Sequence, residues 1–134
     1  MKRPAEFLTD PRFEDVTTGD ETQKLRLLEP LHVYSAVLDR EIIVPVGFVF
    51  EESIPTFLYS LSRPRGDSKR AACVHDWLYV NHGHRMPSGV VITVTRRQAD
   101  DVYYELLRLK GVNPVRAWTR WLALRIAGGH AWAT

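Results

Sequence analysis

The sequence predicts a single α+β domain, in which a small antiparallel β-sheet in the N-terminal half is followed by three α-helices. Segments rich in β-branched and aromatic residues occur before residue 51, and three segments with helix start and stop signals occur after residue 67. The length of 134 residues and a hydrophobic content of 45% fit one domain with a packed core. We assign residues 1–22 to an N-terminal arm and residues 23–134 to the domain.

The N-terminal half contains the predicted strands. Residues 1–22 are polar, with one short strand expected near Phe13. Pro30 and Pro45 cannot donate a ladder hydrogen bond, so each marks an edge or a break. We expect a mostly antiparallel sheet of three or four strands, formed by residues 24–28, 31–35, 40–46 and 48–50.

The C-terminal half contains the three predicted helices. The first covers residues 68–81, begins at a cap formed by Asp67 or Ser68, and stops at Gly83. The second covers residues 96–110, and a short strand is expected before it at residues 90–94. Its start and stop signals are a capping box and a C-terminal glycine, namely Thr95, Gln98 and Gly111.

The third helix is predicted at residues 114–127, with Asn113 as its cap and Gly128-Gly129 as its stop. Apolar residues at helical spacing along it are expected to face the core: Val115, Trp118, Leu122 and Ile126. Trp121 lies off that stripe and Trp132 lies in the tail after the helix, and we expect both to be exposed for contact with a partner chain.

Composition excludes several classes of protein. The net charge of +2 is too small to indicate a nucleic-acid-binding protein. A single cysteine, Cys73, excludes an internal disulfide framework. No run approaches the roughly 20 apolar residues of a membrane helix, and the N-terminus does not resemble a secretion signal.

The most informative segment is the first helix, which carries His75 and Asp76. On a helix, His75 shares an apolar face with Tyr79, whereas Asp76 lies at the edge of that face. Asp100 on the second helix has tyrosine neighbours and needs a partner, because burial of an unpaired carboxylate is costly. His75 is the natural partner, which would leave its other ring nitrogen free as a general base. The alternative is a buried pair that only fixes the register of two helices.

Three motifs follow in a fixed order: Ser53-Ile54-Pro55, then His75-Asp76-x-Leu78-Tyr79, then Ala99-Asp100. On these residues the chain resembles a family of small phage and prophage proteins, domain of unknown function 1353, over about residues 41–129. The family's acidic residue before its A-S-I-P loop falls at Phe50 here, so Glu51 or Glu52 would have to replace it. The resemblance implies a phage or prophage origin and no particular activity.

The first helix is also similar to the active-site helix of secreted phospholipase A2, which reads C-C-x-x-H-D-x-C-Y. This chain has Ala71-Ala72 and Leu78 where that helix has cysteines, and it lacks the family's glycine-rich calcium loop. The similarity implies that His75 activates water, that Asp100 orients the His75 ring, and that Asp76 binds calcium.

These observations define an expected site and an expected function. The expected catalytic residues are His75, Asp100 and Tyr79, and the expected ligands of a divalent cation such as calcium are Asp76 and Glu52. We expect a phage-encoded component of the virion or tail, with hydrolase activity on the cell envelope. The alternatives are a purely structural or adaptor component, or a phage protein that acts on host machinery. Expected partners are other phage structural proteins, a second copy of the chain or an envelope component, in the virion or the host cytoplasm.

Overall fold

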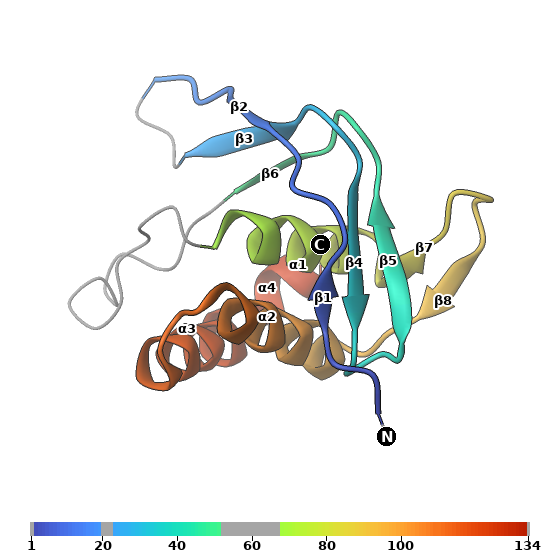
Figure 1. The fold of residues 1–134 in the computed structure, drawn as a ribbon. Helices are drawn as coiled ribbons and strands as arrows, with labels where there is room; N and C mark the ends of the chain where they lie inside the picture. Colours follow the sequence, from blue (N-terminus) through green and yellow to red (C-terminus); the bar gives the residue numbers. More distant parts are fainter. Residues whose placement is uncertain (1, 20–22, 52–67, 134) are drawn as a thin grey trace.

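The computed structural model confirms the α+β fold, with small antiparallel sheets in the N-terminal half and helices after them (Figure 1). The structure describes residues 2–19, 23–51 and 68–133. The strands are β1 (Glu6–Phe7), β2 (Phe13–Asp15), β3 (Lys24–Leu27), β4 (Leu31–Ser35), β5 (Arg40–Val44), β6 (Val49–Glu51), β7 (Gly83–Arg85) and β8 (Val91–Thr93). The helices are α1 (Lys69–Asn81), α2 (Arg96–Lys110), α3 (Pro114–Ala127) and α4 (Gly129–Ala133).

The N-terminal strands form two sheets, which corrects the expectation of a single sheet. One has the order β1-β4-β5 and the other the order β2-β3-β6, and all neighbours are antiparallel. In β3 the side chains alternate, with Leu25 and Leu27 buried and Arg26 exposed between them. Pro45 follows the last residue of β5, and Gly47 adopts a φ of 91°. This turn carries the chain out of the first sheet and into the second.

The segment predicted as an N-terminal arm contributes two strands to these sheets. β2 is the strand expected near Phe13, and it pairs with β3, whereas β1 pairs with β4. The guanidinium of Arg70 on α1 lies 3.7 Å from the ring centroid of Phe7. Residues 6–7 and 13–15 therefore pack on the rest of the domain.

The predicted last residues of α1 and α3, 81 and 127, are confirmed, but the residues expected to stop these helices are corrected in part. The C-cap of α1 is His82, which adopts the left-handed conformation with a φ of 49°, whereas Gly83 begins β7. The His82 ring stacks on Trp132 at 4.3 Å, which helps to hold this conformation. α3 ends at Gly128 as expected, but Gly129 begins the short additional helix α4. By contrast, the bounds of α2 and its capping box are confirmed.

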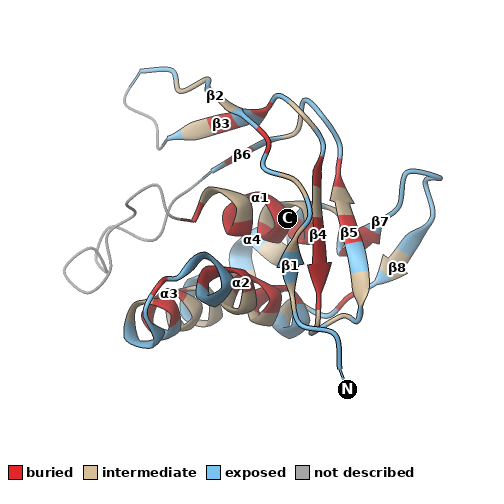
Figure 2. Cartoon of the chain, in the orientation of Figure 1, coloured by how far each residue is buried: buried red, intermediate tan, exposed pale blue. Residues whose placement is uncertain are grey.

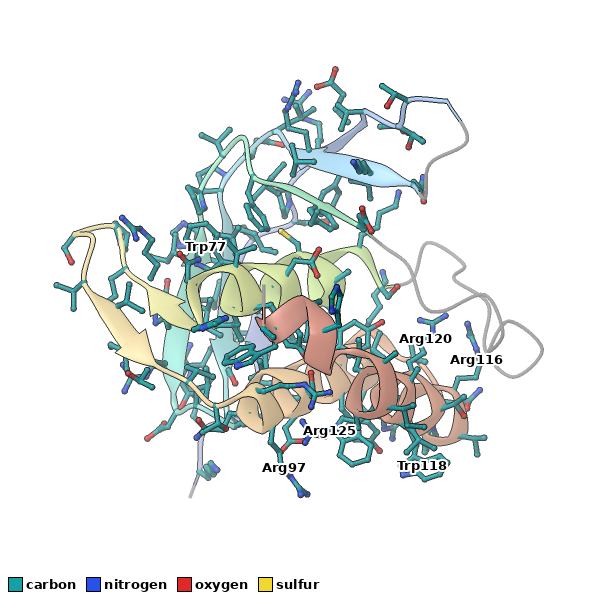
Figure 3. All side chains as sticks on the ribbon, turned by 180° about the vertical axis from the view of Figure 1, so that it is seen from behind. Trp77, Arg97, Arg116, Trp118, Arg120 and Arg125 are labelled. Atoms are coloured by element: carbon teal, nitrogen blue, oxygen red, sulfur yellow. The ribbon has the colours of Figure 1, made fainter. Side chains whose placement is uncertain are left out.

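The apolar stripe of α3 faces solvent, so the expectation that it faces the core is wrong. Val115, Trp118 and Ile126 are 73%, 52% and 66% exposed, and Leu122 is half-buried. The buried face carries small and polar residues instead: Ala117, Thr119, Arg120 and Ala123. Figure 3 shows Trp118 at the outer edge of the molecule, beyond the helices.

The expectation that Trp121 and Trp132 are exposed is also wrong. The indole N–H of Trp121 donates to Asp101 Oδ1 at 2.9 Å, and Trp132 packs edge-on against Tyr79 with ring centroids 5.0 Å apart. Both are half-buried against their own chain.

The core lies where α1 meets the sheets and the other helices. α1 packs against α2 and against β5, β6 and β7, and α2 also packs against α3 and β4. Figure 2 shows the buried residues gathered on β4, α1 and the inner side of α2. None of the helices in the described ranges combines the length and the apolar character needed to cross a membrane.

The capping box of α2 gives a test of this element, whose second turn carries Asp100. Thr95 Oγ1 accepts from the N–H of Gln98 at 3.1 Å, and the Gln98 side chain accepts from the Thr95 N–H at 2.9 Å. We expect Thr95→Ala to lower the free energy of unfolding by about 1 kcal/mol. Thr95→Ser, which keeps the hydroxyl, should remain close to the parent in urea denaturation. Equal losses in both variants would show that the hydroxyl does not act as a cap.

Candidate active site

The site is built around Asp100, whose carboxylate is fully buried in the first turns of α2. Three donors from two other helices reach it. His75 Nε2 lies 2.8 Å and the Tyr79 hydroxyl 2.5 Å from Oδ1, and Arg125 Nη1 lies 2.7 Å from Oδ2. The expected pairing of His75 with Asp100 is therefore confirmed. Both oxygens of the buried carboxylate accept hydrogen bonds, as burial of this charge requires.

The local structure of α1 explains why His75 and Tyr79 act together. They are one helical turn apart, so their side chains share a face, and their ring centroids lie 4.1 Å apart. Ala71 and Ala72 on the preceding turn are buried, and their small side chains allow close packing around α1. α1 therefore brings an imidazole and a phenol to the same carboxylate.

The hydrogen bond with Asp100 determines how the His75 ring is protonated. An ionised carboxylate can only accept, so Nε2 carries the hydrogen and donates it. In the neutral ring Nδ1 is then the unprotonated nitrogen. It lies 3.7 Å from Asp76 Oδ1, which is beyond hydrogen-bond distance. His75 thus retains one nitrogen that can accept a proton from a ligand.

The pKa values of the pair move in opposite directions. Burial lowers the pKa of His75, but the interactions with Asp100 and Asp76 raise it by more than burial lowers it. The net pKa therefore lies above its ordinary value. Burial raises the pKa of Asp100, but the hydrogen bonds from His75, Tyr79 and Arg125 outweigh burial and lower it overall. Burial and the neighbouring Asp100 raise the pKa of Tyr79, which therefore stays a hydrogen-bond donor.

His75 also lines a cavity of about 490 Å³. The volume lies in the range of small-molecule sites. One part of the lining is polar, and the rest is apolar and comes from α1, α2, α3 and α4. The described lining residues are Glu51, Ala72, His75, Asp76, Tyr79, Val80, Tyr103, Leu124, Gly128 and Ala131.

Asp76 joins the cavity to the second sheet. Its Oδ2 accepts the backbone N–H of Glu51 at 3.1 Å, which ties the end of β6 to α1. Glu52, the second expected metal ligand, lies outside the described residues. Across residues 2–19, 23–51 and 68–133, no group of three or more His, Cys, Asp or Glu residues is placed to hold a metal ion. The cation site expected at Asp76 and Glu52 therefore stays a prediction.

Arg125 is a site residue that the sequence pattern did not reveal. It is one of three arginines on the third helix, with Arg116 and Arg120, and a charged stripe of this kind on a helix usually faces solvent. In the structure Arg120 is 1% exposed, and Arg125 binds the buried Asp100. The only available signal was the need of a buried carboxylate for a cation, and that need does not say which arginine meets it.

The chain matches the family described as "Protein of unknown function (DUF1353)" over residues 25–124. Because the match covers most of its length, the chain belongs to this family. No curated protein matches it, and no solved structure does.

The opposite pKa shifts give a pH dependence of stability. The raised pKa of His75 stabilises the fold fully below the unfolded value of about 6.5, and this contribution is lost as the pH rises through the folded value. The lowered pKa of Asp100 stabilises the fold above about 3.9, and this contribution is lost as the pH falls through the folded value. At acidic pH the stability also depends on His84, whose pKa is lowered by burial and by Arg40. The pH dependence on the alkaline side is therefore the better test of the His75–Asp100 pair.

We expect the free energy of unfolding to decline as the pH rises above about 6.5, because His75 loses its proton there. In Asp100→Asn this decline should shrink, since the main anionic partner of the imidazole is gone. Urea denaturation across the pH range measures both proteins. An undiminished decline in the variant would show that Asp100 does not raise the pKa of His75.

Proposed function

We propose that the protein is a hydrolase in which His75 is the general base. The observation that supports this is the placement of one imidazole. Its Nε2 is fixed by a buried carboxylate, while the ring lines a cavity of about 490 Å³. A histidine that served only as a core residue would not need to line a cavity. General-base chemistry requires both features, an oriented ring and access to substrate.

In the proposed reaction Nδ1 removes a proton from a water molecule in the cavity. The resulting hydroxide forms a bond to the electrophilic centre of the substrate, the bond to the leaving group breaks, and the imidazolium returns the proton to that group. Asp100 stays ionised throughout and stabilises the imidazolium, and Tyr79 and Arg125 hold the carboxylate in place. Asp76 and Glu52 would supply oxygen ligands to a divalent cation such as calcium, which when bound stabilises negative charge.

The proposed substrate is a component of the bacterial cell envelope. The mixed lining supports a substrate with a polar reacting group next to apolar atoms, because Glu51 and Asp76 line the same cavity as Val80 and Leu124. The phage origin, the association with a virion or tail, and a location in the virion or host cytoplasm belong to the same proposal. They rest on the resemblance to phage and prophage proteins.

The test is hydrolysis of lipid, peptidoglycan and phosphodiester substrates, with and without calcium, by the parent and His75→Ala. We expect the variant to lose at least about 100-fold in rate, which is the usual contribution of a general base. In the parent the rate should rise with pH through a midpoint above the ordinary histidine value, because the pKa of His75 is raised. His32→Ala is the matched control, since His32 pairs with Glu41 on the surface of β4.

The same variant separates catalysis from a purely structural role. Asp100 keeps Tyr79 and Arg125 when His75 is removed, so the loss of stability should be smaller than the roughly 3–5 kcal/mol of a broken buried pair. A collapse in thermal stability, together with no hydrolysis by the parent on any of the substrates, would reject the catalytic proposal.

A second candidate function is an adaptor or structural component of a phage particle. The observation that favours it is the apolar stripe on α3, where Val115, Trp118 and Ile126 are all exposed. Contiguous apolar surface of this kind is typical of protein contacts. The occupant would be a second copy of the chain or another structural protein.

If the stripe binds a second copy, the parent should form dimers or larger assemblies in light scattering coupled to size exclusion, and the double variant Trp118→Ser, Ile126→Ser should be monomeric. Both side chains are exposed, so the melting temperature should change little. Trp121→Phe, which alters a half-buried tryptophan of the same helix, should associate like the parent. A monomeric parent at all concentrations would contradict self-association.

A further inference from the structure

The cavity beside His75 has one weakly held wall, the short helix α4. Gly128, at the end of α3, and Ala131, on α4, both line the cavity. α4 contains five residues, Gly129–Ala133, and none of them is buried. A helix this short is not stable by itself, so α4 depends on its packing against α1 and α3 (Figure 1). Elements with few buried contacts open at a low cost in free energy.

Trp132 attaches α4 to α1. Its ring packs edge-on against Tyr79 with centroids 5.0 Å apart, and it stacks on the His82 ring with centroids 4.3 Å apart. His82 Nε2 also donates to the carbonyl oxygen of Trp132 at 2.5 Å. Trp132 is half-buried and packs against the core, whereas the residues on either side of it are exposed. Loss of the contacts of this one tryptophan would therefore loosen α4 on α1.

The two glycines between α3 and α4 have different surroundings. Gly128 is buried, and a Cβ there would lie 2.5 Å from the Leu124 carbonyl oxygen and 2.8 Å from the Tyr79 hydroxyl. The end of α3 is therefore tightly packed. Gly129 has more room, because the nearest atoms to a Cβ there would belong to the Arg96 guanidinium at 3.7 Å. A rotation of α4 about the backbone of Gly129 would leave the end of α3 in place.

Such a rotation would uncover an apolar surface. It would remove the indole of Trp132 from the Tyr79 ring, which also lines the cavity. The neighbouring lining includes Val80 and Leu124, whose side chains are aliphatic. An apolar group of a ligand would gain free energy by taking the place of the indole, since it would bury the same surface.

We propose that α4 is a lid on the cavity, and that its opening vacates a binding site on the Tyr79 ring for an apolar group of the ligand. The lid turns at Gly129 and is held closed by Trp132 and His82. That the ligand is a substrate rests on the proposed hydrolase function. The affinity for such a ligand is scaled by the fraction of molecules in which the lid is open.

Two measurements on the full-length chain test the proposal: amide hydrogen exchange of residues 130–133, and binding of the neutral apolar fluorophore phenylnaphthylamine. His82→Gly removes the ring that holds Trp132, while glycine suits the φ of 49° at this position and keeps the end of α1. We expect exchange to be about 10-fold faster, because one hydrogen bond and one ring stack are lost. The affinity for the probe should rise by the same factor, since both quantities follow the open fraction.

Gly129→Ala should act in the opposite direction. A Cβ fits at this position, and alanine restricts the hinge and favours the helix. We expect exchange to be slower and probe binding weaker, each by about 2- to 5-fold. His130→Ala is the matched control, because it removes an exposed imidazole from the same helix and should behave like the parent. Trp118→Ser controls for binding to the exposed stripe of α3 and should bind the probe like the parent.

Unchanged exchange and affinity in His82→Gly and Gly129→Ala would overturn the proposal, as would a parent whose α4 amides are unprotected, because the lid would then not close. Faster exchange without tighter probe binding would also overturn it, and so would loss of probe binding in Trp118→Ser. If His82→Gly does not fold, Gly129→Ala decides. Neither measurement needs hydrolysis. A responsive lid on an inactive parent would support the lid and reject the hydrolase, whereas an active parent with an unresponsive lid would do the reverse.

Discussion

The buried carboxylate of Asp100 is the constraint on which the helical half of the structure depends. It has no access to water, so its charge must be stabilised by donors from the protein. Two donors come from α1 and the third from α3, which means that α1, α2 and α3 can pack together in one arrangement only. If any of them rotates or shifts by one turn, a buried charge loses a partner. The interaction therefore determines the geometry of the packing, whatever its net contribution to stability.

The same constraint sets the chemistry that is available to His75. A carboxylate with no other partner would raise the pKa of the imidazole strongly and keep it protonated, which is unsuitable for a base at neutral pH. Arg125 and Tyr79 share the charge of Asp100 and moderate this effect, although the pKa of His75 remains raised. Asp100 thus fixes the orientation of the His75 ring. Tyr79 and Arg125 separately reduce the effect of the Asp100 charge on the basicity of that ring.

Local signals predicted the parts of this arrangement that depend on local physics. The start of α2 at Thr95 and its end at Gly111 followed from side-chain caps and glycine conformation, and the pairing of His75 with Asp100 followed from helical spacing and the cost of burial. The division of the strands into two sheets depends on long-range pairing, which periodicity does not encode. Arg125 was missed for a related reason, since any of three arginines on that helix could have met the need for a cation.

The outward stripe of α3 follows from the inward requirements of the same helix. Ala117 and Ala123 are small enough to let α3 approach its neighbours closely, and Arg120 between them is 1% exposed. A helix that turns this face inward must turn its larger apolar side chains outward, because the two faces lie on opposite sides of the helix axis. Burying Trp118 and Ile126 would contribute roughly 1.5–3 kcal/mol for each side chain. The monomer forgoes that gain and keeps the geometry in which the last turn of α3 reaches Asp100. The exposed stripe is therefore a consequence of building the site, and it leaves an apolar surface that a partner chain could cover without disturbing the cavity.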